Sequence, residues 1–379
     1  MKRFMKSSWL LFVSILLSAY VFNAKAEHSD NNYINKEFKV CPFNVDGLPQ
    51  SINILGQNIT INADGLGEDG AKAIGEYIAN SGIDVLALSE DFDYHESLTN
   101  GLGGKYQIGT YRGGITNGKL NISDISYDTD GLELLTLSPF SYTSETWTHW
   151  NKSFGKFDHG SDELIKKGYR HYVVNMGNGA FVDFYTMHMD ADTGEKDNAA
   201  RASQWEQLRE AILANKSNHP IVVMGDTNSR YTRDDIQKLF INPIEEAGNY
   251  DVKDAWVELC KNGNYPALGA APLMVDQLGY REGEVVDKVI VLNPKKGTLS
   301  VSATQFDVDE AFDKGDHKPV IVTLKIEGST FAANTAMNWW RGEEIVKNGQ
   351  EAYIYNVGKG TFITGKTPTV TNIDEAATW

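Results

Sequence analysis

The sequence VVMGDTNSR at residues 222–230 is the most informative stretch of the chain for its fold. The run from Pro220 to Met224 is short and apolar, which is typical of a strand buried on both faces. It runs directly into Gly225, and the polar residues Asp226 and Asn228 follow at once. The stretch therefore predicts a buried strand that carries a carboxylate and an amide at its end.

Comparable apolar runs lie on both sides of this stretch. The predicted strands are 38–44, 84–89, 133–137, 171–175, 181–187, 220–224, 285–292 and 320–326. The spacing of Ala71, Ile74 and Ile78 predicts a helix between the first two strands, and a second helix is predicted around Trp205. Apolar strands mixed with helices predict an α/β protein whose sheets are covered by helices.

Polar side chains recur where these strands begin or end. They are Asn44, Asp46, Glu90, His188, Asp226, Asn228, Asp287, Asp316 and His317. Any one of them alone is best explained as a turn or cap residue. Together they supply the oxygen ligands that Mg²⁺ prefers and the acid–base groups that phosphoester cleavage needs. The isolated histidines are interpreted as surface or structural residues: His28, His95, His149, His159 and His219.

The chain resembles the endonuclease/exonuclease/phosphatase (DNase I-like) superfamily, in particular its secreted microbial members. The resemblance covers nearly all of residues 38–326 and rests on segments in the family's order: FNVDGLP (43–49), DVLALSEDF (84–92), GLELLTLSPF (131–140), FYTMHMDA (184–191), VVMGDTNSR (222–230), VVDKVIVL (285–292) and GDHKPVIV (315–322). The resemblance implies a four-layer α/β (α+β) sandwich, in which two mixed β-sheets pack face to face with flanking helices.

The resemblance also implies roles for the strand-end residues. Glu90 is expected to be the main metal ligand, with Asn44, Asp46 and Asp316 as further metal-side residues. The expected catalytic residues are His188, Asp226, Asn228, Asp287 and His317, with Asp287 fixing the tautomer of His317. The resemblance leaves open how Asp226 and His317 divide the acid and base roles. The implied cofactor is Mg²⁺, or else Mn²⁺ or Ca²⁺.

Candidate substrate-binding residues lie beside these motifs. Arg230 and Tyr231 follow the GDTN motif directly and form a local basic and aromatic cluster in an acidic protein. Lys167 lies at the end of the segment 138–168, which is rich in aromatic residues. This segment is predicted to be a loop that either stacks on a substrate, dips into a lipid interface or packs on itself.

The N-terminus predicts export. A basic start and the apolar run from Trp9 to Phe22 precede Ala24-Lys25-Ala26, which is typical of a cleavable signal peptide covering residues 1–26. This removes 4 of the 35 Lys and Arg residues and none of the 51 acidic ones, so the mature net charge becomes −20. We therefore expect a secreted or periplasmic protein without an extended groove for nucleic acid.

The remaining chain is expected to hold one catalytic domain at residues 27–327. Residues 328–379 are predicted to be a linker and the start of a small, incomplete β module, because too few residues follow Trp340 for an independent core. Cys41 lies in an apolar run, and two free thiols are favoured over a bridge with Cys260.

The favoured function is a metal-dependent hydrolase that cleaves a phosphodiester, such as a phospholipid head group, by in-line attack of activated water. A phosphoester substrate and peripheral contact with lipid are expected, and no obligate protein partner is indicated. The alternatives are a secreted DNase I-like nuclease, an inositol-phosphate-type phosphatase, and a non-catalytic binding protein on the same fold.

Overall fold

The computed structural model describes residues 33–330, except for positions 55, 61, 114, 117–118, 121–129 and 157, and three short strands beyond them. The predicted signal peptide lies outside the described residues, as does most of the predicted C-terminal module. Within the described part of the chain, no helix is both long and apolar enough to cross a bilayer. Cys41 and Cys260 are free thiols, as the sequence favours.

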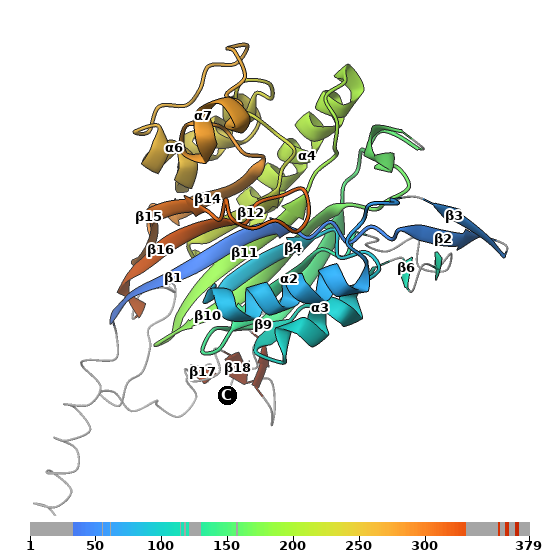
Figure 1. Ribbon diagram of the computed structural model, residues 1–379. Helices are drawn as coiled ribbons and strands as arrows, with labels where there is room; N and C mark the ends of the chain where they lie inside the picture. The colour runs from blue at the N-terminus through green and yellow to red at the C-terminus, as the bar shows by residue number, and fades with distance from the viewer. Residues whose placement is uncertain are drawn as a thin grey trace, which may run out of the picture.

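Two six-stranded mixed sheets form the centre of the fold (Figure 1). The first sheet has the strand order β15 (Leu299–Val308), β16 (Val320–Ser329), β1 (Tyr33–Asn44), β4 (Val85–Ser89), β8 (Glu133–Leu137), β5 (Tyr106–Ile108). The second has the order β13 (Tyr250–Asp254), β14 (Asp287–Pro294), β12 (Ile221–Asp226), β11 (Ala180–His188), β10 (Gly168–Gly177), β9 (Ser141–His149). Strands β1 and β4 are parallel, as are β11 and β12.

Strand β4 shows why its residues are apolar without interruption. Side chains alternate between the faces of a strand. Val85 and Ala87 therefore belong to the large core shared with the second sheet, whereas Leu86 and Leu88 belong to a separate core under two helices. All four are at least 98% buried. The first sheet is thus covered on both faces, as the sequence predicts.

Helices form the outer layers. α2 (Gly67–Ser81) and α3 (His95–Leu102) lie side by side over the first sheet, and α4 (Glu195–Ala214) lies on the far side of the fold with α6 (Ala255–Cys260) and α7 (Val275–Glu282) (Figure 1). Trp205 of α4 is fully buried in the large core. The architecture confirms the α/β sandwich of two mixed sheets with flanking helices.

Shorter helices and strands complete the described structure. The remaining described elements are β2 (Ser51–Ile54), β3 (Gln57–Thr60), β6 (Ile115–Thr116), β7 (Lys119–Leu120), η3 (His159–Ser161), η4 (Gln237–Ile241), α5 (Asn242–Glu246), β17 (Tyr355–Asn356), β18 (Thr361–Ile363) and β19 (Pro368–Val370). Strands β17 to β19 form a three-stranded antiparallel sheet within the predicted C-terminal module.

Candidate active site

Strand pairing brings the first group of predicted residues together. Asn44 at the end of β1 is paired with Ser89 at the end of the parallel strand β4. Glu90 follows Ser89 directly, so its carboxylate and the amide of Asn44 lie at the same edge of the first sheet. The Asn44 amide Nδ2 donates to Glu90 Oε1 at 2.9 Å and reaches Asp226 Oδ2 of the second sheet at 3.2 Å.

The second sheet delivers its own group to the same place. His188 at the end of β11 is paired with Asp226 at the end of the parallel strand β12. Asp226 is paired in turn with Asp287, the first residue of the antiparallel strand β14. His188 Nε2 lies 3.6 Å from Asp226 Oδ2 and 3.9 Å from Glu90 Oε1. Side chains from both sheets therefore meet at one end of the sandwich.

His317 reaches this group from the turn before β16. Because β16 is antiparallel to β1, this turn lies at the edge where β1 ends. His317 Nδ1 lies 2.7 Å from Asp287 Oδ2, and its Nε2 lies 3.6 Å from Asp226 Oδ2. Asp287 is therefore placed to hold the imidazole with one nitrogen facing Asp226.

Three residues of this group have an uncommon backbone conformation. Asp46, Glu90 and Asn228 have φ values of 47°, 59° and 47°, in the left-handed region that side chains other than those of Asn and Asp rarely adopt. The Gly47 amide donates to the Glu90 carbonyl at 2.8 Å, and Asp46 N donates to Asn44 Oδ1 at 3.0 Å. The first contact joins the turns after β1 and β4, and the second stabilises the turn after β1. Such strained positions cluster at functional sites.

Burial and charge shift the pKa of four ionisable groups here. Burial raises the pKa of Glu90, and burial together with Asp316 raises that of Asp46. For Asp226, burial alone would raise the pKa, but the imidazoles of His317 and His188 outweigh it and lower the value. For His317, burial is outweighed by Asp287 and Asp226, which raise its pKa well above the ordinary value.

The donor set fits a divalent cation. Glu90, Asp46 and Asp316 offer carboxylate oxygens, and Asn44 adds an amide oxygen, which are ligands that Mg²⁺ and Ca²⁺ prefer. Burial removes water from the carboxyl groups of Glu90 and Asp46 and raises their pKa, so their charged forms call for compensation by a positive group. A cation bound between these carboxylates would supply that compensation.

Asp130 is a residue of the site that the sequence reasoning missed. Its carboxylate is fully buried, and its Oδ1 lies 2.7 Å from His188 Nδ1. Burial alone would lower the pKa of His188, but Asp130 reverses the shift and raises it. Asp130 directly precedes the matched segment 131–140, and only its pairing with His188 distinguishes it from an ordinary turn residue.

Lys167 lies behind the site and is buried, with 5% of its surface exposed. Its ammonium lies 2.6 Å from Asp162 Oδ1. Although burial alone would lower its pKa, the charges of Asp162, Asp130 and Glu90 raise it. Lys167 therefore compensates carboxylates of the site from within the protein. Because it also lines a cavity beside Trp150, its contact with the substrate stays a prediction.

Tyr231 is also placed differently from the prediction. Its side chain is 2% exposed, and its hydroxyl donates to Asp254 Oδ2 at 2.8 Å inside the large core. The ring therefore cannot stack on a substrate. Arg230 is partly exposed, and its guanidinium lies 3.2 Å from Met274 Sδ. The structure places Arg230 and Tyr231 beside α7 and the core rather than with the carboxylates.

The aromatic segment 138–168 is only partly a loop. Ser141–His149 forms strand β9, which pairs with β10 at the edge of the second sheet. Trp150 is 7% exposed, and its indole nitrogen donates to the His188 carbonyl at 2.6 Å. Tyr142 is buried as well. Much of this segment therefore packs on the protein itself and supports the strand that carries His188.

Known proteins resemble the chain in sequence and in fold. Proteins named sphingomyelinase from Mycobacterium tuberculosis and Mycobacterium bovis are 26% identical over 297 residues, which cover 76% of this chain and 53% of each relative. The chain thus spans about half the length of these curated relatives.

Among solved structures, D. rerio TDP2 complexed with a single-strand DNA product has a TM-score of 0.51 and 15% sequence identity, covering 76% of this chain and 99% of that one. A humanized D. rerio TDP2 with 14 mutations has a TM-score of 0.50 and 14% identity, covering 76% and 98%. These structures share the fold. The model of the Endonuclease/Exonuclease/phosphatase family matches residues 43–278. The chain belongs to the Endonuclease/Exonuclease/phosphatase family.

Proposed function

We propose that this protein is a divalent-metal-dependent phosphodiesterase that hydrolyses a phospholipid head group or a similar small phosphodiester. One observation carries the proposal: two carboxylate-bound imidazoles, His188 and His317, face Asp226 at 3.6 Å each, and Glu90 lies beside them. This arrangement combines proton-transfer groups with a carboxylate set suited to a cation.

The residues have distinct tasks in this proposal. Glu90, Asp46 and Asp316 would hold Mg²⁺, Mn²⁺ or Ca²⁺, with Asn44 orienting the carboxylates of Glu90 and Asp226. The bound cation would offset the charge of the phosphate and polarise its oxygens. The chain's own groups would then position the substrate and move the protons.

Asp226 and Asn228 orient the attacking water and the phosphate. The Asn228 amide donates to the Met189 carbonyl at 3.1 Å and lies 3.5 Å from His188 Nε2. Its second N–H and the protonated imidazole can both donate to phosphoryl oxygens without adding negative charge. His317 exchanges a proton at Nε2, because Asp287 binds its Nδ1. Water attacks phosphorus in line with the leaving oxygen. As the bond from phosphorus to that oxygen breaks, Asp226 and His317 between them accept the proton of the water and supply one to the leaving oxygen.

The choice of a lipid or other small phosphodiester rests on charge, on shape and on the named relatives. The net charge of the whole chain is −16, which disfavours binding along a nucleic-acid backbone. A cavity of about 650 Å³ lies on the Trp150 side of the site, and its lining includes Phe154, Glu163 and four lysines: Lys152, Lys166, Lys167 and Lys196. Basic and aromatic groups together suit a substrate with an anionic and an apolar part. The name sphingomyelinase, given to the mycobacterial relatives, supports the same class.

A panel of substrates tests the proposal. Purified protein with Mg²⁺, Mn²⁺ or Ca²⁺ would be assayed in parallel on sphingomyelin vesicles, plasmid DNA and inositol polyphosphates. We expect turnover of the lipid. Turnover of DNA alone would replace the lipid proposal with a nuclease, and turnover of inositol phosphates alone would replace it with a phosphatase. No turnover of any substrate with any of these cations would support a non-catalytic binding protein.

We further propose that the protein is exported, on the basis of the basic and apolar residues before Ala26. N-terminal sequencing of the protein from the culture medium or periplasm would check this. Export predicts a mature chain that begins at Glu27, and an intact Met1 in a cytoplasmic fraction would contradict it.

A further inference from the structure

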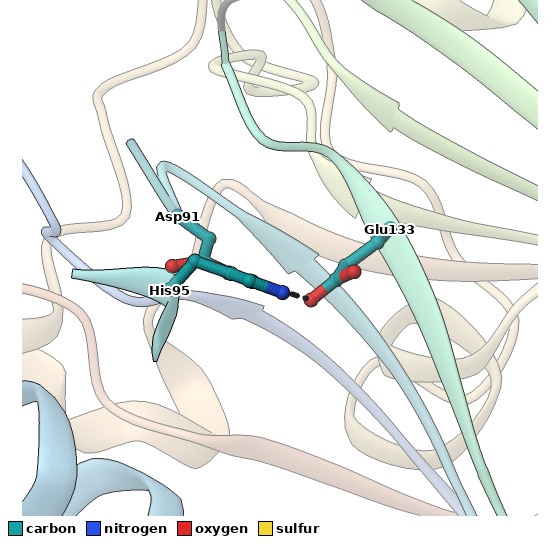
Figure 2. A group of neighbouring side chains, drawn as sticks. All are labelled: Asp91, His95 and Glu133. Carbon is teal, nitrogen blue, oxygen red and sulfur yellow. Dashed lines mark hydrogen bonds and ion pairs between the residues drawn. The ribbon is translucent and has the colours of Figure 1, made fainter. Parts of the chain in front are cut away.

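A second group of ligating side chains lies beside the candidate active site. Asp91 follows Glu90 in the turn after β4, His95 begins α3, and Glu133 begins β8. Figure 2 shows the three side chains converging, with the His95 ring directed at Glu133. One ligand atom from each residue lies within 4.8 Å of the others. None of the three belongs to the catalytic group described above.

The imidazole of His95 is held in place from two sides. Its Nδ1 lies 2.5 Å from Asp91 Oδ2 and 3.7 Å from Glu133 Oε1. Its ring stacks on Tyr111, with the ring centroids 3.8 Å apart and an interplanar angle of 11°. Stacking fixes the ring plane, and the contact with Asp91 directs Nδ1 into the group. The three ligand atoms therefore lie close together, and a cation would replace the hydrogen bond between Nδ1 and Asp91.

Glu133 gives an independent reason to expect a ligand here. Its side chain is fully buried, and neither carboxylate oxygen has a hydrogen-bond donor among the described residues. Burying a carboxylate without a partner is costly. The charge of the Arg170 guanidinium partly offsets that of Glu133, while its Nη1 donates to Glu145 Oε1 at 2.5 Å and to the Thr110 carbonyl at 2.7 Å.

The local charge has the value that a divalent cation would neutralise. Asp91, Glu133 and Glu145 contribute three negative charges, and Arg170 contributes one positive charge. When Asp91 and Glu133 are both ionised and the imidazole is neutral, these four groups and the imidazole carry two uncompensated negative charges. A single divalent cation between His95 Nδ1 and the carboxylates of Asp91 and Glu133 would balance them.

We propose that Asp91, His95 and Glu133 form a second cation site that takes a divalent transition metal, Zn²⁺ or Mn²⁺. An imidazole nitrogen with two carboxylate oxygens suits these metals, whereas Mg²⁺ prefers oxygen ligands alone. Asp91 adjoins Glu90, which has a left-handed backbone conformation. A cation bound to Asp91 would therefore stabilise the turn that holds Glu90 in the candidate active site. The site is structural and does not depend on the proposed reaction.

The competing explanation is a proton. Burial and the charge of Asp91 raise the pKa of Glu133 well above its usual value. A proton shared between the two carboxyl groups would therefore also offset the cost of burying them. A protonated pair and a cation site differ in what they bind. Metal content, measured on the full chain, separates them without reference to activity.

The experiment compares metal stoichiometry after chelator treatment and dialysis against Zn²⁺ or Mn²⁺, measured by inductively coupled plasma mass spectrometry. Glu133→Gln and His95→Gln should each bind about one equivalent less than the parent protein. His149→Gln, which removes an imidazole that packs against Trp147, is the matched control and should bind as much as the parent. Circular dichroism and Tm check that each variant is folded.

A further variant keeps the test decisive if the buried substitutions disturb folding. Glu90→Gln alters the candidate active site and leaves Asp91, His95 and Glu133 unchanged. This variant should therefore still retain about one equivalent of Zn²⁺ or Mn²⁺. The proposal is overturned if Glu90→Gln retains neither metal. It is equally overturned if folded Glu133→Gln and His95→Gln bind as much metal as the parent.

Discussion

His188 Nδ1 lies 2.7 Å from Asp130 Oδ1, and the same distance separates His317 Nδ1 from Asp287 Oδ2. Each imidazole thus has a buried carboxylate behind it and directs Nε2 at the carboxylate of Asp226. A carboxylate in this position fixes the tautomer of the ring and stabilises its protonated form. The site therefore contains two histidine–carboxylate pairs around one central aspartate.

Asp130→Asn is expected to lower kcat by roughly 10²- to 10⁴-fold, the usual contribution of a positioned acid or base. The amide is nearly the same size as the carboxylate but cannot stabilise the charged ring of His188. KM should change much less, because Asp130 is buried behind the histidine. Steady-state kinetics on the identified substrate measure both constants.

The matched control is Asp251→Asn, which makes the same chemical change at an exposed carboxylate on β13. It should leave kcat and KM unchanged. If Asp130→Asn retained parental kcat, the pairing with His188 would have no part in the reaction.

Tyr231→Phe distinguishes a structural role for this residue from substrate binding. The substitution removes the hydroxyl that donates to the buried Asp254, so the free energy of unfolding should fall by about 1–3 kcal/mol. KM should stay the same, because the ring is enclosed in the core. Urea unfolding and kinetics give the two values, and a raised KM with unchanged stability would restore Tyr231 as a substrate contact.

Gly131→Ala should destabilise the protein and reduce its activity. Gly131 has φ +68°, and a Cβ atom there would collide with the backbone oxygen of Asp91. The left-handed conformation alone costs an alanine about 1–2 kcal/mol, and the collision adds to this. Because Asp130 and Asp91 flank the contact, kcat should fall along with Tm. Gly248→Ala is the control, since it has φ +78° and open space around it. An equal loss of Tm and no loss of activity in both variants would refute the importance of the contact.

The buried carboxylate of Asp183 should lower the free energy of unfolding in acid when it is protonated. Burial alone would raise its pKa, but His219 and His171 outweigh burial and hold the pKa far below the ordinary value. The Ser217 hydroxyl also donates to it at 2.7 Å. Since the folded-state pKa lies below the unfolded value of about 3.9, the stabilisation is complete above that pH and is lost as pH falls below it.

The measurement for Asp183 is urea unfolding between about pH 5 and pH 3. The parent should lose stability more steeply over this range than Asp183→Asn, which lacks the titrating group. The same slope in both proteins would show that Asp183 does not contribute to the acid response.

The sequence predicted the sheets well, because their strands are apolar on both faces and end in polar residues. Glu90, His188, Asp226 and His317 were proposed from strand ends, and the structure brings their side chains together at one edge. Their catalytic roles stay predictions. Asp130 and Glu133 were missed because their importance depends on burial and on partners distant in sequence. Tyr231 was placed wrongly for a related reason: adjacency to a motif in sequence does not fix the direction of a side chain, and this one lies in the core.

The most direct test of the central claim is the Mg²⁺ dependence of turnover in the parent, Glu90→Gln and His317→Ala, each checked for folding by circular dichroism. The account predicts that chelator silences the parent, that added Mg²⁺ restores it, and that neither variant reaches more than about one hundredth of parental kcat at any Mg²⁺ concentration. Full turnover by the chelator-treated parent, or by a folded Glu90→Gln protein, would contradict it.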